Sequence, residues 1–418
     1  KTYSIYFTTH RTPPARPHPR PARPSAMARV AAASPSPASP RLPRLLGAPW
    51  TSESAHRRSI SLDGTWTFTT DVPDVGLAQG FPVNGIPLSE RRTAAVPASW
   101  NEQLPELDGF MGPAWYEREI WLPLGVDPQR HCLLLRFGSV NYHASVWLDG
   151  VLLGEHEGGH LPFELEIPVD RASLWGGSRP SRLVVRVDGR LARTHVPPGG
   201  GWGAMAPGCH PNTSFDFYPF CGIQRSVQLL IRPRVGLDAL KLETKLLGDA
   251  TAMLMVEVRA SPSIAFVRAE LLDAAGRPFA LRTCATDSDG CAHLTLGPRK
   301  ANLWAPGSPY LYKIILACYQ LRSQVAKDSL TSDWPPEGTE EDLSDTFRRS
   351  VSEVDCYTQR IGMRTVRVEG DALLLNGKPI VLRGFGRHED FPIIGRGDCA
   401  VVAPVSYTHL TLPTKRIV

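Results

Sequence analysis

The sequence predicts a mostly-β protein that is built from consecutive sandwiches of short strands. From Ser61 onward, apolar and polar residues alternate or form short apolar runs between turn residues, and this is the pattern of strands. The pairs Asp149-Gly150 and Asn376-Gly377 each stand between two such runs, as in hairpins whose type I′ turns need positive φ at both central positions. Across the two predicted sandwiches, no segment carries an apolar face at helical spacing over ten or more residues.

Residues 1–58 are expected to be disordered. Pro, Arg, Ala and Ser dominate positions 11–49, which leaves too few large apolar side chains to offset the entropy of ordering the chain. This segment contains no readable targeting signal. Residues 1–50 hold eight basic residues and no acidic one, whereas 51–404 hold 36 basic and 41 acidic residues. The net charge of +5 therefore lies at the ends of the chain and gives no reason to expect nucleic acid as a partner.

The first folded domain is predicted over 59–234 as an all-β sandwich. Its strand-like runs alternate in polarity or are short and apolar. They are LDGTWTF at 62–68, WYEREIWLP at 115–123, CLLLRFG at 132–138, ASVWLDG at 144–150, VLLGEHEGG at 151–159, PFELEIP at 162–168 and RLVVRVDG at 182–189. No run of 18 apolar residues occurs in the chain, so no membrane span and no membrane partner are expected.

The second domain is predicted over 235–366 as an immunoglobulin-like β-sandwich. Its strand-like runs are spaced by turns, as in the first domain. They lie at 237–246, 252–260, 265–273, 293–297 and 310–321. The TDSDG segment at 286–290 lacks the glycine position and terminal Glu of a calcium loop, so a turn is expected there. The polar, acidic stretch 323–355 indicates an exposed insertion or long loop.

The third segment, 367–400, is expected to begin a further domain. The run IVLRGF at 380–385 is predicted to be a buried strand that leads into a Gly-rich, charged loop ending His388-Glu389-Asp390. The end of such a strand is where a barrel enzyme displays functional groups. Residues 401–418 are expected to be an unrelated or artefactual tail.

The motif His156-Glu157-Gly158-Gly159-His160 formally satisfies the zinc-protease pattern H-E-x-x-H. That pattern binds zinc only on a helix, where both imidazoles project from one face. Two interior glycines weaken a helix by about 1 kcal/mol each, and strand-like runs lie on both sides. A Gly-rich turn between strands is predicted instead, and neither a metal nor a cofactor is expected.

Two positions are candidate binding residues. Asp216 lies among aromatic residues in FDFYPF, as in sugar sites that combine apolar walls with a few placed polar groups. Composition alone favours an ordinary turn aspartate at Asp216. Among His388, Glu389 and Asp390, neighbouring side chains diverge, so we expect one to face a pocket while the others form ion pairs.

The chain resembles glycoside hydrolase family 2, in its β-glucuronidase branch. The resembling stretches occur in family order over about 62–397. They are LDGTWTF, WYEREIWLP, SVWLDG, GEHEGGHLPFE, DFYPFCGIQRSV, LWAPGSPYLY, IGMRTV, LLLNGKPI and GFGRHED. The resemblance implies a jelly-roll sugar-binding domain, an immunoglobulin-like sandwich and a catalytic (β/α)8 barrel. It also implies that Asp216 and His388 line the sugar pocket, reversing the turn interpretation of Asp216.

The implied activity is retaining hydrolysis of β-D-glucuronides by two glutamates about 5 to 5.5 Å apart. Family members carry both glutamates on later barrel strands, so we expect no catalytic residue in this chain and no activity from it alone. A truncated chain and a noncatalytic carbohydrate-binding or interaction module are the two alternatives. The resemblance further implies a homotetramer in intact members, a lysosomal location for an animal protein and a cytoplasmic one otherwise.

Overall fold

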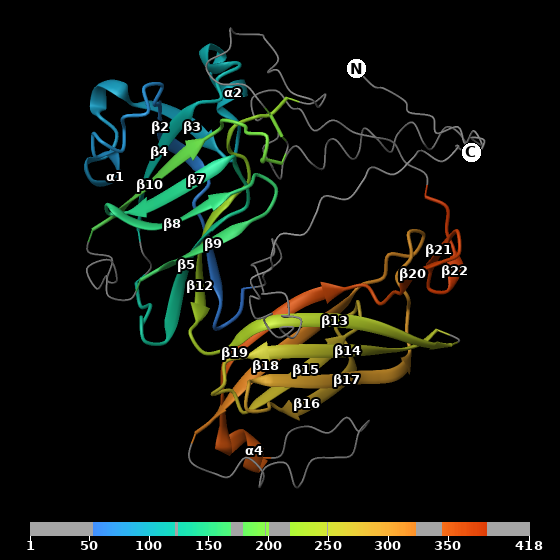
Figure 1. The fold of residues 1–418 in the computed structure, drawn as a ribbon. Coiled ribbons are helices and arrows are strands. Elements are labelled where there is room, and N and C mark those ends of the chain that lie inside the picture. Colours follow the sequence, from blue (N-terminus) through green and yellow to red (C-terminus); the bar gives the residue numbers. More distant parts are fainter. Residues whose placement is uncertain are drawn as a thin grey trace, which may run out of the picture.

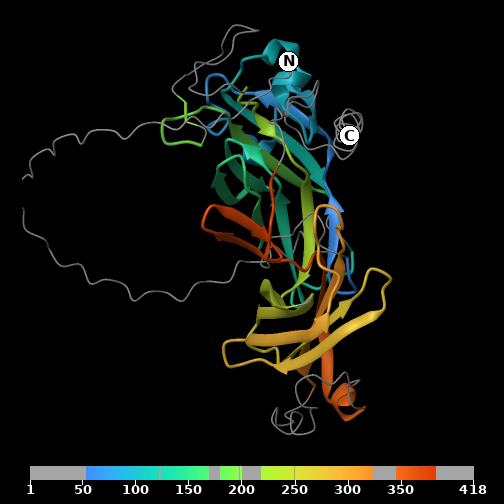
Figure 2. The same cartoon turned by 90° about the vertical axis from the view of Figure 1, so that its right-hand side faces the viewer.

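The computed structural model describes residues 53–121, 124–168, 179–196, 198–199, 218–248, 250–322 and 345–382. These residues form two β-sandwiches followed by a small three-stranded sheet (Figure 1). The first sandwich, blue to green, and the second, yellow to orange, lie at opposite ends of the described structure in both views (Figure 2). The predicted mostly-β fold class is confirmed.

The first sandwich packs a six-stranded sheet against a four-stranded sheet, and every strand pair in it is antiparallel. The six-stranded sheet has the order β3-β2-β4-β10-β7-β8, the four-stranded sheet has the order β1-β12-β5-β9, and β6 pairs with β11. The strands are β1 Arg58–Ser61, β2 Gly64–Thr70, β3 Arg92–Val96, β4 Pro113–Ile120, β5 His131–Phe137, β6 Val140–Asn141, β7 His143–Leu148, β8 Val151–Glu157, β9 Phe163–Ile167, β10 Ser181–Asp188, β11 Gly222–Ile223 and β12 Val227–Pro233. Short helices lie between the early strands: α1 Phe81–Asn84, η1 Leu88–Glu90, α2 Trp100–Gln103 and η2 Pro105–Leu107.

Aromatic side chains fill the core between these two sheets. Phe68 on β2 lies opposite Tyr116 on β4, with ring centroids 5.0 Å apart, and Trp100 of α2 packs against Phe68 at 5.9 Å. Trp115 is also fully buried, but on the other face of β4 in a smaller cluster with Phe81 of α1. Strand β4 is buried on both faces, which explains why WYEREIW does not alternate strictly.

The second sandwich is smaller and joins a three-stranded sheet to a four-stranded one. Their orders are β13-β14-β17 and β16-β15-β18-β19. The strands are β13 Leu237–Gly248, β14 Thr251–Ala260, β15 Phe266–Leu272, β16 Pro278–Ala285, β17 Cys291–Lys300, β18 Tyr312–Leu321 and β19 Val351–Ile361. Helix α4, Asp345–Ser350, precedes β19 and places Phe347 against Phe266. The predicted turn at 286–290 is confirmed, because Asp287 caps the amides of Asp289 and Cys291.

The two predicted hairpins are confirmed. Asp149 and Gly150 join β7 to β8 with φ of 45° and 79°. Asn376 and Gly377 join β21 to β22 with φ of 52° and 76°. All strand-like runs predicted before residue 322 overlap observed strands. No helix among the described residues combines the length and apolar character that a membrane crossing requires.

Three expectations are wrong. The predicted disorder of residues 1–58 does not hold at its C-terminal end, because Arg57 is buried against Asp355 and β1 begins at Arg58. The acidic insertion does not extend to Asp355, because α4 and β19 occupy 345–361 and β19 pairs with β18. The predicted buried strand at 380–385 is not formed over 380–382. After β20 Val366–Glu369, β21 Ala372–Leu375 and β22 Lys378–Pro379, the side chains of Val381 and Leu382 are 85% and 74% exposed. The physical reason is that no described strand pairs with these residues, so their apolar side chains are not covered.

Candidate functional site

The two predicted binding residues, Asp216 and His388, lie outside the residues that the structure describes. Along the chain, the nearest described residue to Asp216 is Tyr218, and the nearest to His388 is Leu382. The candidate site is therefore built from the two stems that flank the segment carrying Asp216. We define these as the leading stem, residues 192–196, and the trailing stem, residues 218–224.

Tyr218 opens the trailing stem and is tied to the turn after η2. Its hydroxyl accepts a hydrogen bond from the Gly109 amide at 2.7 Å and donates one to Asp108 Oδ1 at 3.5 Å. Its ring packs against Phe220 with centroids 4.7 Å apart. Burial raises the pKa of the Tyr218 hydroxyl, so it is a neutral donor at ordinary pH.

Helix α2 and its N-cap residue hold the backbone of Cys221, which lies further along the trailing stem. Asn101 Oδ1 accepts the Cys221 amide at 2.9 Å, and Ser99 Oγ donates to the Cys221 carbonyl at 2.9 Å. The Asn101 amide group also donates to the carbonyls of Leu107 and Phe110, at 3.0 and 2.9 Å. Since Asn101 is 5% exposed, these bonds replace water and fix where the stem leaves the sandwich.

Asn141 in β6 holds the same stem from the opposite side. Its Nδ2 donates to the Phe220 carbonyl at 3.0 Å, and Gln224 Nε2 donates to that same carbonyl. Asn141 also pairs with Gly222 in the β6–β11 ladder. The trailing stem is thus held by side chains from α2, β6 and its own end.

The leading stem is fixed by the residue that follows Asn141. The Tyr142 hydroxyl accepts the Val196 amide at 2.9 Å, and the Tyr142 ring stacks on His195 with centroids 4.2 Å apart. His195 Nδ1 accepts the Ala192 amide at 3.0 Å, which assigns the ring proton to Nε2, 3.2 Å from Glu157 Oε1. The neighbouring residues Asn141 and Tyr142 therefore each hold one of the two stems.

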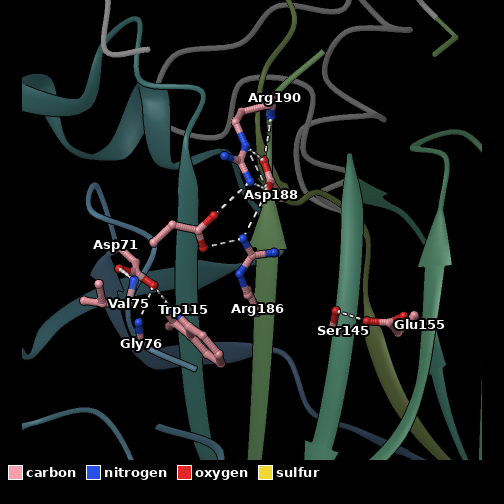
Figure 3. Close-up of polar contacts among 10 residues, drawn as sticks. Asp71, Val75, Gly76, Trp115, Ser145, Glu155, Arg186, Asp188 and Arg190 are labelled. Atoms are coloured by element: carbon pink, nitrogen blue, oxygen red, sulfur yellow. Dashed lines mark hydrogen bonds and ion pairs between the residues drawn. The ribbon is translucent and has the colours of Figure 1, made fainter. Parts of the chain in front are cut away.

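A compact charge cluster lies at the end of β10, where the chain turns toward the leading stem (Figure 3). Arg190 donates to Asp188 through Nε at 2.8 Å, and Arg186 bonds both Asp188 and Asp74, at 3.2 and 2.7 Å. Burial alone would raise the pKa of Asp188, but the hydrogen bonds and positive charge of Arg190 outweigh it and lower this pKa. The cluster contains two carboxylates and two guanidiniums, so it fixes the turn and does not supply an acid/base pair.

Two further carboxylates also have structural partners, the buried Asp71 and the exposed Glu155 (Figure 3). Asp71 accepts the amides of Val75 and Gly76 and the Trp115 indole, at 2.8, 2.8 and 2.9 Å. Glu155 accepts the Ser145 hydroxyl at 2.7 Å. Asp71 is buried and both of its oxygens accept hydrogen bonds, which leaves it poorly placed to act on a ligand.

The H-E-x-x-H sequence forms the predicted turn. His156 and Glu157 end β8, and residues 158–162 turn into β9 without a helix. His156 stacks on Phe163 at 4.3 Å, and burial lowers the pKa of its imidazole. A Cβ on Gly159 would overlap the Asn141 carboxamide, so the glycine allows this close approach. Among the described residues, no group of three or more His, Cys, Asp or Glu side chains could hold a metal ion.

The sequence analysis missed the residues that hold the stems. One local signal was present, because Ser99 caps α2 and Glu102 follows three positions later, as in a capping box. No local signal marks Asn101, Asn141 or His195, since the contacts by which they hold the stems, to Cys221, Phe220 and Tyr142, join residues far apart along the chain.

Comparisons with known proteins identify the same parts. The family model described as the sugar binding domain of glycosyl hydrolases family 2 matches residues 60–233, and the TIM barrel domain model of that family matches 366–402. Beta-glucuronidase of Canis lupus familiaris is 32% identical over 366 residues, covering 82% of this chain and 50% of that protein. The Rattus norvegicus beta-glucuronidase is 32% identical over 361 residues, with the same coverage. The chain spans about half the length of these curated relatives.

Solved structures give the same result. The crystal structure of Ruminococcus gnavus beta-glucuronidase is similar with a TM-score of 0.69 and 27% identity, over 86% of this chain and 54% of that one. The complex of the Ruminococcus gnavus enzyme with D-glucuronic acid is similar with the same TM-score and identity, over 87% and 55%.

Proposed function

Since this chain belongs to glycosyl hydrolase family 2, we propose that it is the N-terminal part of a β-glucuronidase. Its reaction is retaining hydrolysis of β-D-glucuronides, either in glycosaminoglycans or in small-molecule conjugates. One observation carries the proposal: the similarity to β-glucuronidases continues over 82% of the chain, across the sugar-binding sandwich and into the first residues of the barrel.

In this proposal Asp216 is lent by the first sandwich to the sugar pocket, and His388 lines that pocket from the barrel. The support for Asp216 is its position two residues before the trailing stem, which buried hydrogen bonds hold in place. Solved relatives in complex with D-glucuronic acid support a glucuronide as the ligand. No residue of this chain is assigned as the catalytic acid/base or nucleophile.

The proposal is tested by expressing the 418-residue chain and the longest reading frame that contains it, and by assaying both on 4-methylumbelliferyl β-D-glucuronide. We expect hydrolysis by the long product and none by the 418-residue chain, because a (β/α)8 barrel takes about 250 residues. Glucuronide turnover by the purified chain that H388A abolishes would overturn the expected inactivity. A long product that cleaves only β-galactosides would overturn the assigned substrate.

The second candidate is a noncatalytic carbohydrate-binding or interaction module. It is favoured by the restriction of the TIM barrel match to 366–402, beside a match to the sugar binding domain over 60–233. Calorimetric titration of the chain with glucuronides and glycosaminoglycan oligosaccharides, without turnover, would support it. Binding to neither ligand class would leave it without support.

Compartment and assembly follow as proposals. The relatives compared above include beta-glucuronidases of dog and rat, which favours the lysosomal alternative over the cytoplasmic one. We propose a homotetramer for the intact protein, as in the family. Organelle fractionation and light scattering of the long product would test the two proposals separately.

A further inference from the structure

A buried ion pair joins the two sandwiches at the point where their connecting linker lies. Arg57 immediately precedes β1 of the first sandwich, and Asp355 lies in β19 of the second. The guanidinium binds the carboxylate in bidentate fashion, with Nε to Oδ1 at 2.8 Å and Nη2 to Oδ2 at 2.6 Å. Arg57 is 6% exposed and Asp355 is fully buried.

The same two side chains also hold the first residue after the linker. Asp355 Oδ2 accepts the Leu237 amide at 2.8 Å, and Arg57 Nη2 donates to the Leu237 carbonyl at 3.2 Å. A Cβ on Gly236 would overlap the Asp355 carboxylate, so this linker residue must be glycine for the contact to close. Three chain segments therefore meet at one bidentate pair, whose planar geometry fixes direction as well as distance.

Other contacts at this junction are weaker. His56 Nε2 lies 3.3 Å from Glu353 Oε1, but these side chains are 28% and 41% exposed. Exposed pairs contribute little because water screens them. Among the described ion pairs of this junction, the Arg57–Asp355 pair is the one that fixes the angle between the sandwiches.

Each sandwich is in turn tied to one part of the proposed sugar pocket. The stems around Asp216 are fixed to the first sandwich through Asn101 and Tyr142. The β20–β22 sheet, where the barrel match begins, is fixed to the second sandwich because Asn376 Nδ2 donates to the Trp304 carbonyl at 3.1 Å. The angle between the sandwiches therefore sets how the two stems lie relative to the β20–β22 sheet.

We propose that Arg57 and Asp355 are a positioning pair that holds the two stems in register with the β20–β22 sheet. This inference rests on the proposed function for its link to the sugar, but the geometry that it predicts can be measured without one. Positioning matters because a displacement of about 1 Å in an active site can reduce a rate on the order of a hundredfold.

The test is a distance measurement between two spin labels in the 418-residue chain. The labels are attached to genetically encoded keto amino acids, so the cysteines stay untouched. They replace Val196 in the leading stem and Val368 in β20, whose side chains are 66% and 76% exposed. Double electron–electron resonance should give one narrow distance for the parent chain. The matched control is Arg58→Met, because Arg58 is the exposed neighbour of Arg57.

Two variants at Arg57 decide the result. R57M/D355L removes both charges, and apolar replacement of a buried pair is often neutral for stability, but the Leu237 amide also loses its acceptor, so a broad distance distribution with a lower melting temperature is expected. R57K keeps the charge but not the bidentate geometry, and intermediate broadening is expected. A folded R57M/D355L with the parent distribution would overturn the inference. If that variant does not fold, an unbroadened R57K would overturn it.

Titration of the parent chain and R57K with D-glucaro-1,5-lactone separates this inference from the proposed function. Broadened distances together with no lactone binding by the parent chain would count against the sugar site, while the positioning of the segment would stand. Lactone binding by the parent chain together with unchanged R57K distances would count against the positioning pair alone.

Discussion

Truncation of Asn101 to Ala should destabilise the first sandwich and release the trailing stem. The change removes four hydrogen bonds, from the Cys221 amide and the Ser99 hydroxyl and to the carbonyls of Leu107 and Phe110; the Ser99 hydroxyl keeps the Cys221 carbonyl. The Leu107 carbonyl keeps the Phe110 amide, and the Phe110 carbonyl keeps the Trp100 indole, at 2.9 Å each. Only the Cys221 amide loses its sole partner. An orphaned buried donor costs about 1–3 kcal/mol and the two weakened carbonyls about 1 kcal/mol together, so a loss of about 2–4 kcal/mol is expected.

Urea unfolding of the chain, followed by tryptophan fluorescence, measures this loss, and hydrogen exchange at the Cys221 amide locates it. Exchange there should become faster in N101A, while amides of the second sandwich keep their parent rates. The control is Asn84→Ala at the exposed end of α1, which should change stability by less than about 0.5 kcal/mol. A loss below about 0.5 kcal/mol in N101A, with unchanged exchange at Cys221, would refute the assignment of Asn101 as the anchor.

Three further outcomes are expected. Because the pKa of Asp188 is lowered in the fold, its ionised form contributes stability that is present above the unfolded pKa of about 3.9 and is lost as pH falls through the lower folded pKa. D188N should therefore lower the melting temperature at pH 6, and this loss should shrink as the pH is lowered below about 3.9. Gly159→Ala should lower the melting temperature, because its Cβ overlaps a side chain of β6. The parent chain is expected to self-associate through exposed apolar side chains. V368D/V381D places charge at two of them, so it should elute later than the parent chain in size-exclusion chromatography.

Each of these outcomes has a control that contradicts it. A pH-independent effect of D188N would show that its ionisation is not linked to folding. Gly307→Ala places its Cβ in open space, so an equal effect of G307A and G159A would remove the steric argument. A parent chain that already elutes as a clean monomer would contradict the apolar-surface prediction.

Local pattern was sufficient to predict strands whose residues alternate in polarity or form a short apolar run, and insufficient where polarity is mixed or acidic. Alternation and the Asp149-Gly150 turn predicted β7 and β8 correctly. Strand β16 was missed because it begins with Pro278 and carries mixed polarity. Strand β19 was missed because its sequence is acidic, and only pairing with a distant arginine allows Asp355 to be buried. The two residues of this ion pair are 298 positions apart, so no local sequence pattern predicts it.

The residues of the candidate site also fall into those that the sequence predicts and those that it does not. Family motifs point to Asp216 and His388, but a motif states only which residue is present and not what holds it. The supports are polar residues that look ordinary in sequence, such as Asn141, whose role exists only because β6 and β11 pair. A buried hydrogen bond between distant segments is a property of the fold and cannot be inferred from composition.

The position of the two stems relative to the β20–β22 sheet depends on how the two sandwiches are joined. The stems of the Asp216 segment are held by the first sandwich, and the β20–β22 sheet is held by the second. Neither set of contacts crosses the linker, so neither can bring the two halves of a sugar pocket together. That task falls to contacts at the junction, of which the bidentate pair of Arg57 and Asp355 is buried and directional. Under the proposed function, a pocket shared between domains would depend on this pair as well as on the residues that line it.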